Sequence, residues 1–270
     1  VRSRRQRQMC IRDRLWTAPG ALDTDGAEAR YAVSYDAVAQ HVGALTGQRY
    51  AIDAPAPVDE AQWDPAVPGL WWLEGTYNLP CGLPIATPGA GGGWVHTEVV
   101  RVLVEQGLVP DEFSAPAWVP VDKDGQITRG SQIFKKLGTR ITDGLKSIPR
   151  DTDDPLESRV RGALKSMYAE SSGELTRHPF VRRPDWSMTI LAASKAQTIR
   201  RAIRVHEDTG LWPIHVKVDC LTYETDGPDP EKHNPAPGIL RLDPEKTHPG
   251  MVKTDFAGTL AEFAKKQKGK

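Results

Sequence analysis

The chain has 270 residues, enough for one large domain or two small ones with a substantial core. Its 35 basic and 35 acidic residues balance, so overall charge predicts no polyanionic partner, and any nucleic-acid surface must come from local clustering of cations. Its three cysteines, Cys10, Cys81 and Cys220, show neither a metal-ligand spacing nor an even disulfide framework. With no apolar stretch near the roughly 20 residues of a membrane span, the sequence predicts a cytoplasmic protein that does not bind a membrane.

The first fourteen residues, VRSRRQRQMCIRDR, are basic and lack an apolar period. A basic arm of this kind can bind nucleic acid. The part QMCIRD, however, resembles the translation of a transposon-type sequencing adapter at the end of a metagenomic contig. We therefore treat residues 1–14 as a disordered artefact that is left out of the fold, and expect the natural protein to begin upstream.

The next part of the chain predicts one strand, one helix and a long loop-rich stretch. Residues 30–47 predict a short strand running into a helix, with Asp36 at the junction, where an aspartate can serve as a helix N-cap. Residues 48–93 are rich in loops, with one apolar strand near 70–73. The segment 86–93, ATPGAGGG, lacks the lysine and the Ser/Thr of a phosphate-binding P-loop and is interpreted as a flexible connector.

The remainder is predicted to be mainly helical. Apolar periods, caps and closing glycines predict helices over 94–107 (N-cap Thr97), 132–148, 153–173 and 185–210, and a last amphipathic helix with Phe256, Leu260 and Phe263. In the helix over 153–173, a stripe of Val160, Leu164 and Met167 is predicted to be buried. Arg161 and Lys165 share another face, which is predicted to point away from the core.

Residues 214–220, IHVKVDC, alternate in the manner of a half-buried strand. Ile214, Val216, Val218 and Cys220 fall on one face, and His215, Lys217 and Asp219 on the other. An edge strand with a solvated face explains the pattern. The alternative is that the carboxylate of Asp219 lines a site.

Two aspartates in distant strands, with a cationic helix between them, form a recognisable chemical set. Phosphoryl transfer by the two-metal route requires carboxylates that hold two divalent ions roughly 3.5–4 Å apart. Magnesium keeps water and takes further ligands from substrate phosphates, so it needs few protein oxygens. A nearby cation is also needed to neutralise the triphosphate.

In this order of motifs, the chain resembles the B-family DNA polymerases. Residues 36–42, DAVAQHV, lie at the position of that family's first motif, DxxSLYP. Residues 165–173, KSMYAESSG, match the spacing of KxxxNSxYG, and residues 215–220, HVKVDC, match YxDTDS. The stretch between the first two motifs resembles the protein-primed branch. The pair RRPDW (182–186) and DGPDP (226–230) is similar to telomere-associated proteins of linear actinobacterial replicons.

The resemblance, which covers about residues 30–258, implies an α/β fold with a polymerase-like palm, an antiparallel sheet with packed helices, and short helical fingers. Residues 15–131 would form the first part of the palm with an inserted loop-rich element. Residues 132–173 would form the fingers-like helical pair. Residues 174–270 would complete the palm and end in a C-terminal helix.

The resemblance also implies roles for single residues. Asp36 and Asp219 would be the catalytic ligands of two Mg²⁺ ions. Lys165, helped by Arg161, would hold the phosphates of a deoxynucleoside triphosphate. The implied activity is DNA-directed nucleotidyl transfer in DNA replication, with DNA and a terminal protein as partners.

Several positions depart from the family's pattern. Lys217 replaces the first aspartate of YxDTDS, and His41 replaces the tyrosine beneath the sugar of the nucleotide. Ser172 and Ala169 replace the tyrosine and asparagine of the second motif. The pattern predicts metal-dependent nucleotidyl transfer with altered substrate checking, in which His41 and Ser172 contact the nucleotide.

Two other interpretations stay open. In the first, the protein is an inactive polymerase derivative that binds DNA ends or a terminal protein, and the ammonium group of Lys217 occupies the space of a metal ion. In the second, it is an unrelated α/β domain. Trp186 and the pair Trp71–Trp72 are either core aromatics or platforms on which bases stack.

Overall fold

The computed structural model describes residues 15–23, 30–38, 40–149, 152–177, 179–180, 182–243 and 251–268, without the side chains of residues 168, 169, 171, 172 and 268. The artefact predicted at residues 1–14 lies outside this set. The described chain divides into two compact units. We call residues 15–40, 80–83 and 198–268 the aspartate unit, and residues 41–79 and 84–197 the tryptophan unit.

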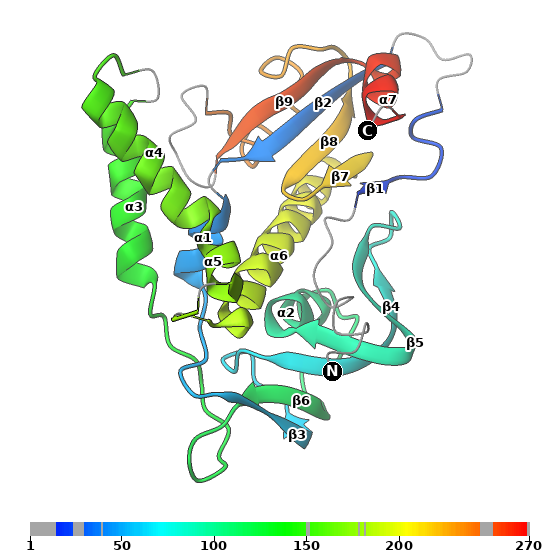
Figure 1. Ribbon diagram of the computed structural model, residues 1–270. Coiled ribbons are helices and arrows are strands. Elements are labelled where there is room, and N and C mark those ends of the chain that lie inside the picture. The colour runs from blue at the N-terminus through cyan, green and yellow to red at the C-terminus, as the bar shows by residue number, and fades with distance from the viewer. Residues whose placement is uncertain are drawn as a thin grey trace. The chain divides into compact units, whose positions relative to one another are not determined.

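The aspartate unit is built on a five-stranded antiparallel sheet (Figure 1). In spatial order its strands are β1 (Trp16–Thr17), β7 (His215–Lys217), β8 (Cys220–Thr225), β2 (Tyr31–Ala37) and β9 (Val252–Thr259). Strand β2 is paired on both sides, and Ala32, Val33 and Tyr35 are fully buried. Because consecutive side chains of a strand point to opposite faces, this burial shows that both faces of the sheet are covered at β2.

Helix α7 (Leu260–Lys268) packs against this sheet through Leu260 and Phe263, which form a buried cluster with Ala32. The prediction of a single helix that includes Phe256 is wrong. Phe256 lies in β9, and its ring packs on that of Phe263 with 5.2 Å between centroids. The chain passes from strand to helix between Thr259 and Leu260, so a period of 3.6 residues cannot extend back to Phe256.

The tryptophan unit contains a four-stranded antiparallel sheet, in the spatial order β3 (Pro55–Gln62), β6 (Ser114–Pro120), β4 (Leu70–Asn78) and β5 (Pro84–His96). Trp71 is fully buried and contacts Trp63 edge to face at 4.9 Å between centroids, so it is a core aromatic. Helix α2 (Thr97–Glu105) packs on β4 and β5, and its residues Val99, Val100, Val102 and Leu103 are buried.

The prediction of a flexible connector over residues 86–93 is wrong, because this glycine-rich segment is part of strand β5. The strand pairs with β4 through several register shifts, and Gly89 and Gly92 adopt positive φ angles of 85° and 74°. A Cβ atom on Gly92 would lie 2.4 Å from the indole ring of Trp72. The glycines therefore allow the strand to bulge and to pass close to an aromatic ring.

The predicted helices of the tryptophan unit are present with shifted ends, but the one predicted over residues 153–173 is wrong, because the chain forms one helix up to Ala169 and a separate helix from Ser171. The helices of this unit are α1 (Gln40–Gly47), α2, α3 (Lys135–Ser147), α4 (Pro155–Ala169), α5 (Ser171–Arg177) and α6 (Pro184–Thr209), of which α1 and α6 continue into the aspartate unit. Trp186 of α6 packs on Tyr50 and Phe134, and its indole donates a hydrogen bond to the carbonyl of Ala51 at 2.7 Å. These contacts make Trp186 a core-edge aromatic.

The predicted buried stripe of α4 is wrong, and only Leu164, which lies over Gly144 of α3, is even half-buried. Val160 and Met167 are 42% and 50% exposed, and Leu156 is 68% exposed. The contact with α3 runs along Leu164 and Arg161, which lie on one side of α4 at a spacing of three residues. The stripe at 160 and 167 is therefore turned away from α3.

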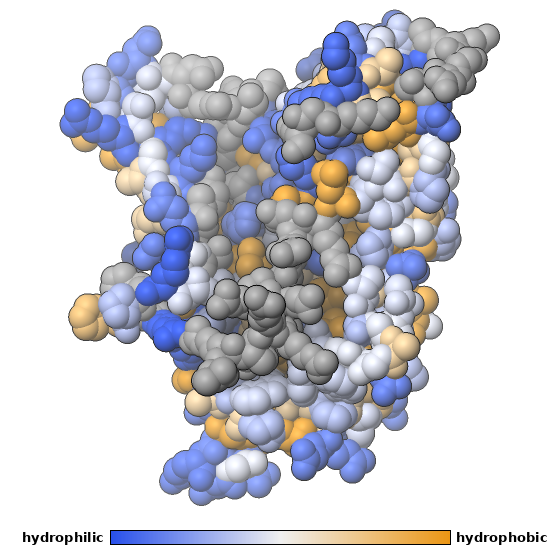
Figure 2. All heavy atoms as spheres, turned by 45° about the vertical axis from the view of Figure 1, so that its right-hand side comes forward, coloured by the Kyte–Doolittle hydropathy of each residue, from blue (hydrophilic) through white to orange (hydrophobic). Residues whose placement is uncertain are grey.

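Among the described residues, no helix has the length and the apolar character needed to cross a bilayer. The face shown in Figure 2 is mostly hydrophilic, with its hydrophobic residues in small separate groups. Scattered apolar residues of this kind are ordinary on protein surfaces.

The predicted fold class, α/β with antiparallel sheets and packed helices, is confirmed.

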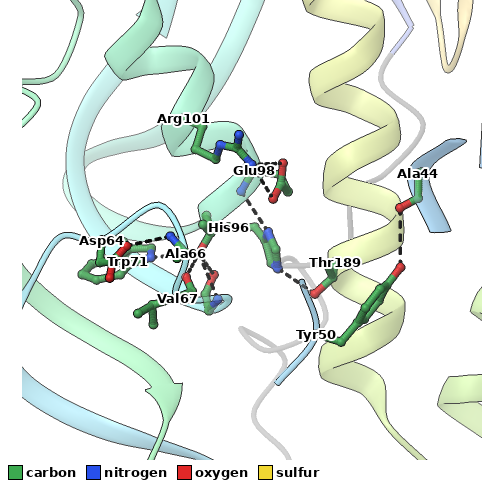
Figure 3. Close-up of polar contacts among 12 residues, drawn as sticks. Ala44, Tyr50, Asp64, Ala66, Val67, Trp71, His96, Glu98, Arg101 and Thr189 are labelled. Carbon is green, nitrogen blue, oxygen red and sulfur yellow. Dashed lines mark hydrogen bonds and ion pairs between the residues drawn. The ribbon is translucent and has the colours of Figure 1, made fainter. Parts of the chain in front are cut away.

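Helix α2 is capped by the buried side chain of His96 (Figure 3). The prediction that Thr97 is its N-cap is wrong. Nδ1 of His96 accepts a hydrogen bond from the backbone N–H of Glu98 at 3.2 Å, and Nε2 lies 3.1 Å from the hydroxyl of Thr189. That hydroxyl donates to the carbonyl of Asp185, so it accepts from Nε2, which carries the proton. Burial lowers the pKa of His96 to about 4, so the ring is neutral at pH 7.

His96→Ala is expected to lower the free energy of unfolding by about 2 kcal/mol at pH 7, because the helix loses its cap and the buried site is left partly empty. His96→Asn is expected to lose less than half as much, since the amide oxygen can accept the same backbone hydrogen bond. Urea unfolding of the three proteins measures both values. Equal losses in the two variants would show that the cap contributes nothing.

Candidate functional site

The two aspartates predicted to form the site lie next to each other in the aspartate unit. Asp36 lies in β2, directly opposite Cys220 of β8 on one side and Lys253 of β9 on the other. Asp219 immediately precedes Cys220. The carboxyl groups of Asp36 and Asp219 are close enough to share a hydrogen bond. Asp36 is therefore a strand residue, and the role of a helix N-cap does not apply to it.

Asp219 lies in a tight turn and not within a strand, so the continuous strand predicted over 214–220 is wrong. Lys217 of β7 pairs with Cys220 of β8, and Val218 and Asp219 form the two-residue turn between them. The chain reverses there, and the alternation of the sequence cannot continue across the turn. His215, predicted on the solvated face, is 2% exposed, and its ring packs edge to face against that of Phe263 of α7 at 5.2 Å between centroids.

The backbone of this turn is strained at Val218. Its φ angle is 54°, in the left-handed region that β-branched residues rarely adopt. A conformation of this kind costs about 1–3 kcal/mol and persists only where the surrounding structure enforces it. Here it brings the following residue, Asp219, back toward Asp36.

Two cations accompany the aspartates. The Nζ atom of Lys253 lies 2.7 Å from Oδ2 of Asp36, in an ion pair that is partly buried. Arg201 of α6 is 7% exposed and donates to Oε1 of Gln40 at 3.5 Å. Burial lowers the pKa of Arg201, whereas the negative charges of Asp219 and Asp36 act to raise it, so the guanidinium lies within electrostatic reach of both carboxylates.

The environment favours the protonated form of Asp219. Burial, the charge of Asp36 and the hydrogen bond with Asp36 together raise the pKa of Asp219 to about 7. The hydrogen bond with Asp36 also raises the pKa of Lys253. At neutral pH Asp219 is therefore close to half protonated, and a bound cation would displace this proton.

The register of the sheet aligns four residues in one row: Lys217, Cys220, Asp36 and Lys253. Directly opposed residues of adjacent strands project from the same face, so both lysines lie on the face that carries Asp36. Burial and the nearby carboxylates raise the pKa of Cys220 to about 12, which keeps its side chain a neutral thiol. The row thus places a cationic side chain on each side of Asp36.

The remaining predicted residues lie on helices α1, α4 and α5. Lys165 is exposed on α4, and Nη1 of Arg161 donates to the carbonyls of Leu145 and Ile148 at the C-terminal end of α3. His41 is half-buried in α1. Ser172 belongs to α5, and its side chain is outside the described atoms. The roles of these four residues toward a nucleotide stay predictions.

Sequence reasoning missed Lys253 and Arg201. The alternating pattern around Lys253, in VKTDFAGT, could have indicated a strand, but its last residues merge with the apolar period of α7. Arg201 is one of several arginines along α6, and nothing in the sequence distinguishes the buried one.

Within the described residues, no group of three or more His, Cys, Asp or Glu side chains forms a potential metal site. A metal ion at Asp36 and Asp219 would thus have two protein carboxylates.

No protein-family model matches the chain. Among curated proteins, it is similar to a probable phospholipid-transporting ATPase IIB of Homo sapiens, with 27% identity over 120 residues, 43% of this chain and 9% of the ATPase. Among solved structures, it is similar to phi29 DNA polymerase complexed with single-stranded DNA, with a TM-score of 0.48 and 13% identity over 83% of this chain. A complex of phi29 DNA polymerase with primer-template DNA gives a TM-score of 0.48 and 12% identity over 90% of this chain.

The chain spans 9% of the length of the ATPase and 42% of the length of each polymerase chain. Neither likeness is close enough to assign the chain to a family.

Proposed function

We propose that the protein is a nucleotidyltransferase similar to B-family DNA polymerases, which adds deoxynucleotides to DNA in a reaction that depends on divalent metal ions. The observation that carries this proposal is the convergence of Asp36 and Asp219. These residues are far apart in the sequence, and their carboxyl groups lie within hydrogen-bonding reach of each other beside one sheet. The sequence motifs that resemble the polymerase family supply the substrate class, and DNA is the proposed partner.

The residues present fit a divalent ion. Carboxylate oxygens are the ligands that Mg²⁺ prefers, and Mg²⁺ needs only one or two protein carboxylates when a substrate phosphate supplies other ligands. When bound, the ion would polarise the reacting phosphate and stabilise developing negative charge. Asp36 and Asp219 would hold it, and the shared proton of the pair would leave on binding.

The other residues of the chain would bind and position the substrate. Lys165 is exposed and free of the helix-capping contacts of Arg161, so we assign it the main role in holding the triphosphate. His41 and Ser172 are proposed near the sugar and base on the strength of the motif positions alone. Protein priming and a terminal protein as partner rest on the same resemblance.

A second candidate function is a catalytically inactive module that binds DNA ends. The feature that favours it is the pair of lysines on the face of Asp36, above all Lys253, whose ammonium group forms an ion pair with that carboxylate. An ammonium group in contact with the site can replace a metal ion electrostatically. This function would require DNA binding without any need for a divalent ion.

The wild-type protein is expected to extend a labelled primer on a DNA template when Mg²⁺ or Mn²⁺ and deoxynucleoside triphosphates are present, and to stop when EDTA is added. Thermal unfolding gives an independent measurement, because a competent site binds nucleotide and metal ion together. The two ligands combined should raise the melting temperature by more than the sum of their separate effects. DNA binding with neither extension nor combined stabilisation would favour the inactive module.

A further inference from the structure

We propose that the site takes one divalent ion and that the ammonium group of Lys253 supplies the second positive charge. This inference rests on the proposed function, which places a metal ion at Asp36 and Asp219. It departs from the two-ion arrangement that the sequence motifs imply. In this arrangement Lys253 is a positioning residue, because it acts through its ion pair with Asp36.

The contact between Lys253 and Asp36 is fixed by the sheet. The two residues are direct partners across β2 and β9, and Nζ lies 2.7 Å from Oδ2. The side chain of Asp36 is 19% exposed, so solvent weakens this ion pair less than it weakens one on an open surface. Because the strands hold both backbones, the side chain of Lys253 starts directly beside Asp36.

This contact uses one of the oxygens that a pair of ions would need. An aspartate that bridges two metal ions offers one oxygen to each. In Asp36, Oδ2 already accepts from the ammonium group, so a second ion would have to compete with Lys253 for that oxygen. Within the described residues no third carboxylate, imidazole or thiol joins Asp36 and Asp219 in a potential metal site.

The charges of the site also favour one divalent ion over two. Two carboxylates face two cations, Lys253 and the buried Arg201, so the group is neutral when both carboxyls are ionised. One divalent ion adds two positive charges, which a triphosphate can balance. A second ion would bring two more positive charges close to the first ion and to the ammonium group of Lys253, in a partly buried region where repulsion between cations is poorly screened.

Counting bound Mn²⁺ tests the inference directly, because the free ion has a strong electron paramagnetic resonance signal that binding removes. The full chain is titrated with Mn²⁺ in the presence of a deoxynucleoside triphosphate, and the ions bound by the same nucleotide without protein are subtracted. The wild type is expected to bind one ion at the site. Asp219→Asn is expected to lose that ion, which distinguishes it from adventitious binding.

Variants of lysine identify the source of the second charge. Lys253→Met, which keeps the length of the side chain, is expected to bind a second ion or to bind the first at least about tenfold more tightly, a change of about 1.4 kcal/mol. Lys253→Arg retains the charge and should still bind one ion. Lys265→Met, an exposed lysine of α7, is the matched control and should behave as the wild type.

The outcomes separate this inference from the proposed function. Two ions in the wild type would overturn the inference and leave the proposed function standing. No ion in the wild type at millimolar Mn²⁺ would overturn the proposed function, and with it the inference. A second ion gained by Lys217→Met but not by Lys253→Met would also overturn the inference, because the charge would then come from the other end of the row.

Discussion

Asp36→Asn and Asp219→Asn are each expected to lower the rate of nucleotide incorporation about 10³-fold. Each variant removes a carboxylate that would hold the metal ion, and the transition state thereby loses several kcal/mol of charge stabilisation. The amide has nearly the same shape and can keep a hydrogen bond between positions 36 and 219. DNA binding and the folded structure should therefore survive. Primer extension measures the rate, and a gel-shift titration measures the affinity for DNA.

The matched control for these variants is Asp208→Asn. Asp208 is an exposed aspartate near the end of α6 in the same unit, and its replacement should leave the rate within about twofold of the wild type, as is usual for surface positions. Incorporation that persists in both site variants would show that the convergence of the two carboxyl groups has no catalytic meaning. Loss in the control as well would indicate a general loss of folding.

The second large effect concerns pH. The folded state raises the pKa of Asp219 to about 7, chiefly by burial and by the charge of Asp36, with Lys253 acting in the opposite direction. Between the unfolded pKa, near 4, and about 7, the folded protein therefore holds a proton that the unfolded chain releases. In the absence of metal ions, this group makes the protein less stable as the pH rises through that window.

Asp219→Asn removes this dependence. Relative to the wild type in EDTA, the variant is expected to gain about 1–3 kcal/mol of unfolding free energy on going from pH 5 to pH 8, less than the full pKa shift implies because the site is partly exposed. Urea unfolding of both proteins at several pH values measures the difference. The comparison cancels His96, whose lowered pKa makes stability rise with pH between about 4 and 6.5 in both proteins. A difference that does not change with pH would contradict the raised pKa of Asp219.

Local patterns predicted the main helices but only some of the strands. The strand that contains Asp36 and the four main helices follow from apolar periods and caps, whereas β3, β5 and β6 were not predicted. The hairpin at Val218 could not be predicted in this way, because valine favours strands and the turn lacks the Asn-Gly or Asp-Gly pair of common hairpins. Contacts with the rest of the sheet enforce the turn, and such contacts are not visible in the local sequence.

The candidate site was predictable only in part, for a similar reason. Asp36 and Asp219 could be selected by their motif positions. Lys253 enters the site because β9 pairs with β2, a pairing between distant segments that no local pattern encodes. The failed prediction for residues 86–93 shows the same limit, since those glycines form a strand only because β4 and the ring of Trp72 lie beside them.

The left-handed backbone of Val218 lowers the stability of the turn that carries Asp219. Glycine or asparagine adopts the same backbone conformation at lower cost, so a laboratory selection for heat resistance alone should enrich such replacements at position 218. These replacements keep the geometry of the turn, and Asp219 should therefore stay beside Asp36 in the more heat-resistant proteins.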